Sequence, residues 1–438
     1  MNLWLKNKTM ARKIFISILG TGYYYPTKYY FNNEISGNEL ECRFIQQATI
    51  NHFCTNWNDD DKIYFFLTKD ARKISWNNPA QKNNKNNKES YTGLSQIIKQ
   101  LNLKPEILDI PNGNNEQEIW EIFQIIFNKL NNNDEVYFDI THAFRSLPML
   151  VMVLINYAKF LKNIEVKSIT YGNHQAEKDG YSPVINLTAF SELQDWTNGI
   201  NEFVKNGISY QLTDLIRKKS TNKKGREKQN LQKFAIELNN FILLFSSVRG
   251  RQIYEGNNFK ELEKQIKIIK QNTTIKVLEP IIKELENKIS NFSNYFNMKN
   301  GEIAINWCIE HNLIQQAYTL GQEHIISILC DKFNLEYKER IDREIISKTI
   351  GIINEERKLK KTIDEKDLDK TLLDNLAKYY KIKKESLINE ISQDFGELSR
   401  FRNSINHGGM VDDFQGKDFK KNFEKFYNKI TEILNKCS

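Results

Sequence analysis

The chain has 438 residues, of which 40% are hydrophobic and 27% are charged, a composition typical of globular proteins that excludes a disordered chain. This length predicts two or three domains, because one hydrophobic core seldom serves more than about 200 residues. Lys and Arg number 63 against 55 Asp and Glu, and the formal net charge is +8. A moderate positive excess is compatible with an anionic partner such as nucleic acid.

The cysteines are scattered and odd in number, and none forms a CxxC pair (Cys42, Cys54, Cys308, Cys330 and Cys437). This pattern predicts neither a zinc knuckle nor a disulfide framework. The apolar run Ile14–Leu19 follows several basic residues but is too short for a signal peptide. No stretch approaches the roughly 20 apolar residues that span a bilayer. We therefore expect a cytoplasmic protein with no membrane partner.

Short apolar runs alternate with longer amphipathic stretches in residues 1–192. Several runs are apolar on both faces, as in buried parallel strands. This alternation predicts an α/β domain with a Rossmann-like, parallel sheet. The expected strands are Lys13–Leu19, Lys62–Leu67, Glu106–Ile110, Glu135–Ile140, Val166–Tyr171 and Val184–Thr188. The expected helices are Glu39–Trp57, Tyr91–Leu101, Glu116–Leu130 and Arg145–Leu161.

The strand pattern stops near Leu193, and the rest of the chain is predicted to be all-helical. Residues 193–230 include the strongly basic stretch Arg217–Asn230 and are expected to form a helical, basic connector. Residues 231–438 are expected to form a separate helical domain. Its predicted helices are Leu231–Phe245, Phe259–Phe296, Leu313–Phe333, Lys338–Glu356, Leu368–Tyr380, Glu385–Asn406 and Lys417–Asn435.

Near the C-terminus, a predicted helix ends at Asn406, because Gly408 and Gly409 follow it as a C-cap would. Arg402 lies five residues before His407, which places the two side chains about 140° apart around the helix. They would converge more easily with the same pair from a second copy of the chain.

Arg402 and His407 are the residue types that metal-free cleavage of RNA requires. A histidine can take the proton of a 2′-hydroxyl or give one to the leaving 5′-oxygen. An arginine can stabilise the charge that develops on the phosphorane. Asn403 could hold the histidine or position the phosphate, and Arg400 is a second basic candidate.

The sequence Leu-Ser-Arg-Phe-Arg-Asn-Ser-Ile-Asn-His-Gly-Gly (398–409) resembles the signature of HEPN-domain ribonucleases, in which four to six residues separate an arginine from a following histidine. The resemblance implies that Arg402, Asn403 and His407 form the catalytic group. It also implies a helical HEPN bundle for the C-terminal domain.

A second motif, Asp139 to Pro148, follows a predicted strand and opens a predicted helix. Parallel sheets bind ligands at the carboxyl ends of their strands, and helix N-termini attract phosphate. The turns after the first and fifth strands would lie at the same edge. We therefore predict a ligand site formed by Gly20, Thr21, Gly22, Thr141, His142, Ala143, Arg145, Ser146, Gly172 and Asn173.

Two other interpretations of this edge remain open. Asp139, His142 and His174 could bind a metal, although a hydrogen-bonded polar network is the simpler explanation, and we predict no metal. A hydrolytic triad of Asp139, Thr141 and His142 is disfavoured, because one short turn places a nucleophile and its base poorly.

The segment Asp139-Ile140-Thr141-His142 resembles the DxTHG-type motif of CRISPR-associated proteins with a CARF domain, with Ala143 in place of the glycine. Together, the two resemblances cover nearly the whole chain. They imply an accessory ribonuclease of type III CRISPR antiviral systems with no cofactor. Its CARF domains, in a homodimer or higher oligomer, would bind cyclic oligoadenylate, most often the tetra-adenylate. This ligand would activate metal-independent cleavage of single-stranded RNA to a 2′,3′-cyclic phosphate.

The sequence leaves two alternative functions. In the first, the chain is a nucleotide-sensing regulatory module whose helical half has no RNase activity. In the second, the CARF pocket is a ring nuclease that degrades cyclic oligoadenylate, an activity that could coexist with RNA cleavage. The size of the ring and the base preference for RNA do not follow from the sequence.

Overall fold

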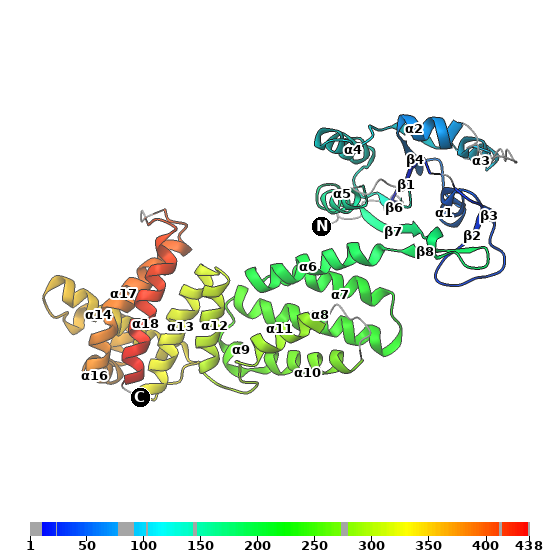
Figure 1. Cartoon of the computed structure of the whole chain (residues 1–438). Coiled ribbons are helices and arrows are strands. Elements are labelled where there is room, and N and C mark those ends of the chain that lie inside the picture. Colours follow the sequence, from blue (N-terminus) through cyan, green and yellow to red (C-terminus); the bar gives the residue numbers. More distant parts are fainter. Residues whose placement is uncertain are drawn as a thin grey trace. The chain divides into compact units, whose positions relative to one another are not determined.

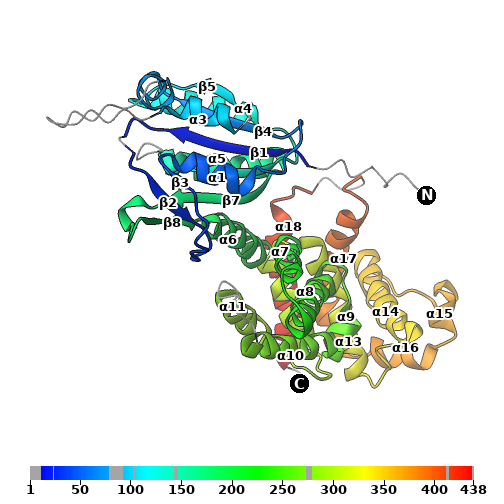
Figure 2. The same ribbon diagram turned by 90° about the vertical axis from the view of Figure 1, so that its right-hand side faces the viewer.

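The structure, a computed structural model, describes residues 11–22, 24–77, 92–101, 104–142, 147–272, 279–410 and 414–436. The chain forms two compact units, Met1–Asp195 and Trp196–Ser438 (Figure 1). The first contains a sheet covered by helices, and the second is helical, as Figure 2 shows from another side. The predicted fold class, α/β followed by all-α, is confirmed.

The N-terminal sheet is mixed, with the strand order β3-β2-β8-β7-β6-β1-β4-β5. Its five strands from β7 to β5 run parallel, as predicted, but β8 pairs antiparallel with β7, and β3 pairs antiparallel with β2. The chain between β7 and β8 is too short for the crossover that a parallel pair needs, so β8 returns antiparallel. The strands are β1 Lys13–Leu19, β2 Thr27–Tyr30, β3 Glu41–Cys42, β4 Lys62–Leu67, β5 Glu106–Asp109, β6 Glu135–Asp139, β7 Glu165–Gly172 and β8 Tyr181–Asn186.

Helices cover both faces of this sheet (Figure 1). Side chains alternate between faces along a strand, so Ile14, Ile16 and Ile18 of β1 pack toward α4 and α5. Phe15 and Leu19 pack on the opposite face, toward α1 and α3. The helices of this unit are α1 Ile45–Phe53, α2 Lys69–Ala71, α3 Leu94–Gln100, α4 Glu116–Lys129 and α5 Leu147–Lys162, with a π-helix at Arg72–Asn77 and a 3-10 turn at His174–Ala176.

The predicted helix Glu39–Trp57 was wrong at its start, because Glu41–Cys42 pairs with β2 and α1 begins only at Ile45. The expected strand Val184–Thr188 begins earlier, at Tyr181, and Thr188 already belongs to α6. Gly93 precedes α3, which therefore starts later than the expected Tyr91, a residue outside the described part.

The C-terminal unit has one continuous hydrophobic core. Neighbouring helix pairs include α7 with α8, α8 with α10, α12 with α13, and α17 with α13, α14 and α18. The helices are α6 Thr188–Asn206, α7 Tyr210–Thr221, α8 Gly225–Ser246, α9 Gly250–Glu255, α10 Asn257–Asn272, α11 Glu279–Ile289, α12 Lys299–Glu310, α13 Ile314–Lys332, α14 Arg340–Leu359, α15 Lys370–Leu373, α16 Leu376–Lys383, α17 Ser386–Asn406 and α18 Asp418–Lys436, with a 3-10 turn at Glu365–Asp367.

Residues 193–230, set apart in the sequence as a basic connector, form α7, most of α6 and the start of α8. Trp196, Phe203, Leu212 and Ile216 from this stretch are buried in the core of the helical unit. All four residues precede the strongly basic stretch Arg217–Asn230.

Two long predicted helices are each divided in the structure. The expected helix Phe259–Phe296 corresponds to α10 and α11, and residues 273–278 lie outside the described part. The expected helix Leu368–Tyr380 corresponds to α15 and α16, which are separated at Asp374 and Asn375. Within the described residues, no helix is long and apolar enough to cross a membrane.

Candidate functional site

The first candidate region is the edge of the sheet where β1, β6 and β7 end. Parallel pairing places Ser17 of β1 opposite Asp139 of β6, and Asp139 opposite Thr170 of β7. The predicted ligand turns therefore meet at one edge, which is where α/β sheets bind ligands. Among the predicted ligand residues, Gly20 contacts His142 and Gly172 contacts Thr141. The other described ones, Thr21, Gly22 and Asn173, belong to the same turns, whereas Ala143, Arg145 and Ser146 lie outside the described residues.

The motif residues Asp139 and Thr141 connect the strands of this edge. The buried Asp139 carboxylate accepts hydrogen bonds from the Ser17 hydroxyl (2.8 Å) and from the Thr141 hydroxyl (2.5 Å) and amide (3.1 Å). The Thr141 Oγ1 in turn accepts a hydrogen bond from the Gly172 amide (2.9 Å). Burial raises the pKa of Asp139, and the hydrogen bonds from Thr141 and Ser17 act in the opposite direction. Asp139 and Thr141 thus hold the turn in place rather than point outward from it.

The glycines of this edge are required by contacts within the protein. A Cβ on Gly20 would lie 2.8 Å from the Tyr24 hydroxyl and 3.0 Å from the His142 carbonyl oxygen. A Cβ on Gly172 would lie 2.6 Å from the Ile45 Cδ1. A side chain at either position would force Tyr24 or Ile45 to move, and Gly20 thus allows the turns after β1 and β6 to approach each other.

His142 and Tyr24 form the apolar inner part of this edge. Their ring centroids lie 4.0 Å apart. Burial lowers the pKa of His142 to about 3 and raises the pKa of Tyr24 to about 12, so both side chains are neutral near pH 7. The Nε2 of His142 is buried and has no hydrogen-bond partner among the described residues. It is therefore available to a ligand that can enter the edge.

His174, in the turn after β7, lies outside the Asp139 network. The Nδ1 of His174 lies 3.4 Å from the Ser182 hydroxyl, and the His174 ring stacks on Tyr25. Asp139 is instead occupied by Ser17 and Thr141. Across the residues that the structure describes, no three His, Cys, Asp or Glu side chains come together as metal ligands.

The second candidate region is the C-terminal end of α17. His407 caps this helix, and its amide donates to the Asn403 carbonyl (2.9 Å). Gly408 and Gly409 follow with φ of +67° and +68°, and the Gly409 amide donates to the Ser404 carbonyl (2.8 Å). This is the Schellman arrangement that ends a helix with a left-handed residue. It leaves the His407 side chain exposed at the helix end.

A groove of about 810 Å³ runs between α14 and α17 and reaches His407. Its α17 side spans residues 393–407, which corresponds to about 21 Å of helix. Its volume lies in the range of known ligand sites. The residues that line it are Gly351, Asn354, Glu355, Arg357, Lys358, Gln393, Gly396, Glu397, Ser399, Arg400, Asn403, Ser404 and His407.

Arg402 is not among the residues that line this groove. Its Nη1 donates to the Asn403 side chain (3.3 Å), and its Nε is buried with no partner among the described residues. Within one chain, His407 therefore shares the groove with Asn403 and Arg400 but not with Arg402. This agrees with the roughly 140° that five residues turn on a helix.

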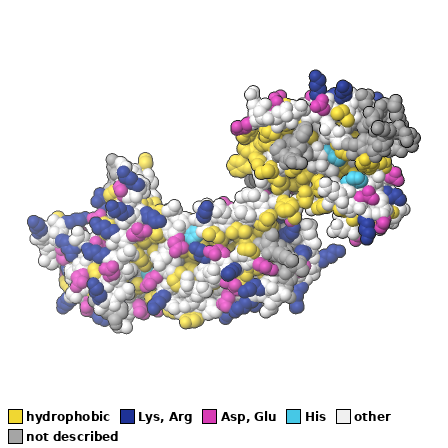
Figure 3. Space-filling model, in the orientation of Figure 1, with side chains coloured by type: hydrophobic (Ala, Val, Ile, Leu, Met, Phe, Trp, Pro, Cys, Tyr) yellow, Lys and Arg dark blue, Asp and Glu magenta, His cyan; other side chains and the backbone are white. Residues whose placement is uncertain are grey.

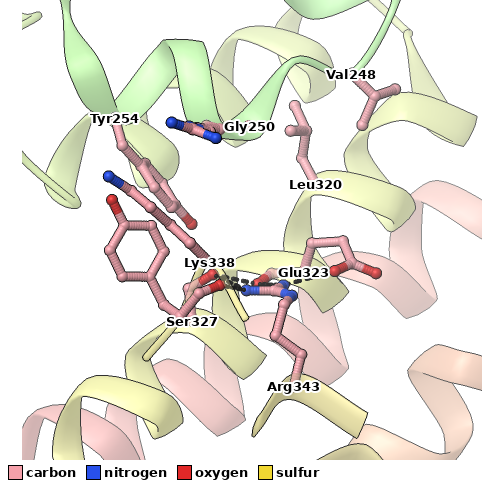
Figure 4. Close-up of a pocket in the computed structure, with 10 residues that line it drawn as sticks. Val248, Gly250, Tyr254, Leu320, Glu323, Ser327, Lys338 and Arg343 are labelled. Atoms are coloured by element: carbon pink, nitrogen blue, oxygen red, sulfur yellow. Dashed lines mark hydrogen bonds and ion pairs between the residues drawn. The ribbon is translucent and has the colours of Figure 1, made fainter. Parts of the chain in front are cut away.

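A smaller cavity of about 280 Å³ lies between α9, α13 and α14 (Figure 4). Arg343 donates to Ser327 (2.8 Å) and to the Glu323 carboxylate (2.6 Å), as the dashed lines of Figure 4 show. The guanidinium also donates to the Tyr337 and Glu323 carbonyls, so both of its terminal nitrogens are used by the protein. The Arg343 guanidinium thus joins helices, and both of its terminal nitrogens already donate within the protein.

The exposed face of α5 carries a stripe of apolar side chains. Residues three and four positions apart share one helix face. The stripe consists of Met149, Val153, Tyr157, Phe160 and Leu161, which are 76, 59, 47, 85 and 49% exposed. Figure 3 shows hydrophobic side chains gathered over α5. A contiguous exposed apolar surface of this kind is typical of a protein interface.

Several residues of the two regions were missed in the sequence. Gln46 donates to the Ser17 hydroxyl (3.1 Å), and Arg43 donates to the Tyr24 carbonyl (3.1 Å). The aromatic run after Gly22 was a signal for Tyr24. No local signal indicated the groove residues of α14, because only tertiary packing brings that helix beside α17.

Residues 14–175 match the family described as "CRISPR system endoribonuclease Csx1, CARF domain". The chain is 28% identical over 240 residues to the CRISPR-associated protein MJ1674 of Methanocaldococcus jannaschii, an alignment that covers 52% of this chain and 35% of that protein. The chain thus spans about a third of that relative's length. Among solved structures, Enterococcus italicus Csm6 bound to cyclic hexa-2′-fluoro-hexa-dAMP matches with a TM-score of 0.42 and 12% identity, over 97% of this chain and 94% of that one.

Proposed function

We infer that the protein acts in CRISPR defence, because its N-terminal unit is similar to the CARF domain of a CRISPR endoribonuclease family and the chain has a CRISPR-associated relative. We propose that the protein is an endoribonuclease of type III CRISPR defence, activated by cyclic oligoadenylate and independent of metal ions. The observation that carries the proposal is the exposed His407, which lies in the groove between α14 and α17 of a chain whose other unit matches a CARF domain. Single-stranded RNA is the proposed substrate.

His407 would act as the general base or the general acid of the reaction. The 2′-oxygen of the substrate attacks phosphorus, the bond from phosphorus to the 5′-oxygen breaks, and a 2′,3′-cyclic phosphate and a 5′-hydroxyl result. Histidine can accept the 2′-hydroxyl proton or protonate the leaving oxygen. Arg402 would stabilise the added negative charge of the phosphorane. Asn403, which contacts Arg402 and lines the groove, would position these groups.

A homodimer would bring an Arg402 and a His407 side chain into one site, although the two side chains of a single chain point apart. The two residues lie on different sides of α17, so an arginine from a second chain would complete each site. The α5 stripe supplies an unpaired apolar surface that a second copy would cover through a two-fold interface. A higher oligomer could form from such dimers.

The sheet edge of each N-terminal unit would bind half of a cyclic oligoadenylate, most often the tetra-adenylate. Support comes from the exposed turn at Thr21 and from the buried, unpartnered Nε2 of His142, which could hydrogen-bond to an adenosine. A two-fold symmetric ring of nucleotides matches a two-fold pair of identical edges. Switching from 1% to 99% active would require a preference of about 5.5 kcal/mol for the active state.

The test is an RNase assay in EDTA, with and without cyclic tetra- and hexa-adenylate. We expect cleavage only with one of the rings, products that end in a 2′,3′-cyclic phosphate, and loss of cleavage in His407→Ala and Arg402→Ala. His52→Ala, which changes a histidine of the other unit, is the matched control and should retain activity. Cleavage that persists in His407→Ala would overturn the site, and full cleavage without any ring would overturn the switch.

A further inference from the structure

Gly351 lies in the interior of α14 without a packing reason to be glycine. It is exposed, and a Cβ at this position would meet nothing within 4 Å. Glycine is unfavourable in a helix interior, because it loses the most backbone freedom on folding. Gly351 also lines the groove that reaches His407. The consequence of the missing side chain is therefore open space in the groove.

Gly396 provides the contrast on the opposite wall. A Cβ on Gly396 would lie 2.7 Å from the Asn354 Nδ2, so a side chain at this position would displace the Asn354 amide group between α17 and α14. The Asn354 Nδ2 also donates to the Ser392 carbonyl (2.6 Å), which holds the amide group in the groove wall. Gly396 is thus explained by helix packing, whereas Gly351 is not.

Ser404 contributes an unused polar group to the same groove. It is 5% exposed, and its Oγ is buried with no hydrogen-bond partner among the described residues. A buried hydroxyl without a partner is unfavourable unless a ligand satisfies it. Ser404 lines the groove three residues before His407, beside the proposed reaction.

The charged residues of the groove favour a polyanion moderately. Arg357, Lys358 and Arg400 line it together with the carboxylates Glu355 and Glu397, so cations outnumber anions by three to two. Arg357 and Lys358 are both exposed, but Arg357 uses its Nη2 on the Asn389 carbonyl (2.9 Å). Lys358 is the better placed of these two to contact a phosphate.

We propose that this groove holds the RNA strand that adjoins the scissile phosphate. A base would lie in the space left by Gly351 and hydrogen-bond to Ser404 and Asn354, and a phosphate would lie near Lys358. This inference rests on the proposed function, because it assigns the substrate of the same site. Gly351 and Ser404 are thereby specificity-determining positions rather than catalytic residues.

The test introduces side chains at Gly351 that occupy the open space of the groove. Gly351→Ala and Gly351→Leu should both raise the melting temperature, because each side chain is a better helix former than glycine. We expect Gly351→Leu to raise KM for an oligoribonucleotide about tenfold or more, and Gly351→Ala to raise it less. Cleavage of a dinucleotide, which is too short to extend along the groove, should be affected least. Binding of cyclic tetra-adenylate should be unchanged in both variants.

Two further variants separate substrate binding from a structural role. Ser404→Ala should raise KM and change the preference among bases without lowering the melting temperature, because it removes an unpaired hydroxyl. Lys358→Glu should weaken RNA binding in a salt-dependent manner, whereas Lys381→Glu, an equal charge change on an exposed position of α16, should not. An unchanged KM in Gly351→Leu and Lys358→Glu would overturn the groove assignment while leaving the proposed function intact. Loss of the proposed function would show instead as full cleavage in His407→Ala.

Discussion

At the scale of single residues, the N-terminal motif has a structural role that its sequence did not reveal. The Thr141 hydroxyl donates a hydrogen bond to Asp139 and accepts one from the Gly172 amide, so it connects the ends of β6 and β7. The sequence motif predicts Thr141 as a ligand donor, and its direct contact with a ligand remains a proposal. Among the described residues, the neighbouring His142 instead carries a buried side-chain nitrogen without a partner, and the Gln46 Oε1 is a second such atom.

The low pKa of His142 predicts a loss of stability in acid. The folded protein has a pKa of about 3 at this residue, because burial disfavours the charged ring, whereas an unfolded histidine has a pKa of about 6.5. Below pH 6.5, the unfolded chain therefore binds a proton that the folded chain does not. The free energy of unfolding should fall between pH 6.5 and 3 by at most about 1.4 kcal/mol per pH unit, or about 2 kcal/mol from pH 7 to pH 5.

Urea unfolding at pH 7 and pH 5 measures this effect, and His142→Gln is the control that removes the titrating group. Burial also lowers the pKa of His52 and His311, so these two histidines add to the pH dependence of stability in both proteins. The contribution of His142 is therefore the difference between wild type and His142→Gln in how far the free energy of unfolding falls from pH 7 to pH 5. Equal pH dependence in wild type and His142→Gln would contradict the prediction.

At the scale of elements, the end of α17 determines where His407 lies. The helix pattern and the two glycines predicted this end correctly, because a helix and its cap depend on residues close in sequence. The same local reasoning gave β1 and β4 their correct bounds. It missed β2 and β3, because these short strands form only by pairing with partners that local periodicity cannot indicate.

The left-handed glycines predict a graded effect of substitution at the helix end. Gly408 has a φ of +67°, and alanine in that conformation costs about 1–2 kcal/mol. Gly408→Ala should lower the stability of the helical unit by that amount and reduce RNA cleavage, because His407 would move. Gly408→Asn should do less harm, since asparagine tolerates the left-handed region.

Thermal unfolding and RNase assays on the same variants measure both effects. The control is Gly416→Ala, where a Cβ would meet nothing within 4 Å and φ is not positive. That variant should match the wild type. If Gly408→Ala were as stable and active as the control, the end of α17 would not position His407.

At the scale of the whole molecule, the proposed activity requires two chains. Arg402 and His407 lie on different sides of α17, and the α5 stripe leaves apolar side chains in solvent. Covering this surface would contribute about 25 cal/mol for each Å² of apolar area removed from water. The proposed dimer would therefore explain both the divided catalytic pair and the exposed stripe.

Charged substitutions on the stripe should dissociate that dimer. Val153→Glu and Phe160→Glu each place a charge where an apolar contact is proposed, and an interface residue of this kind contributes about 2 kcal/mol. The dimer dissociation constant should therefore rise about thirtyfold or more, with a parallel loss of ring-activated RNA cleavage. Sedimentation at several concentrations measures the association.

Tyr210→Glu is the control, because Tyr210 of α7 is 75% exposed but lies outside the stripe. It should leave the association unchanged. Both stripe variants should keep their melting temperatures at concentrations where the wild type is monomeric. Dimers of normal affinity in Phe160→Glu would contradict the assignment of α5 to the interface.

The sequence by itself determined the two fold classes, the order of the central strands and helices, and the spacing of Arg402 and His407. These features depend on periodicities of two and about 3.6 residues and on local turn chemistry, which neighbouring residues express. Only the tertiary structure decided that Thr141 binds Gly172, 31 positions away, and that Gly351 lines the groove that reaches His407. Contacts between distant segments depend on how whole elements pack, so no local pattern could reveal them.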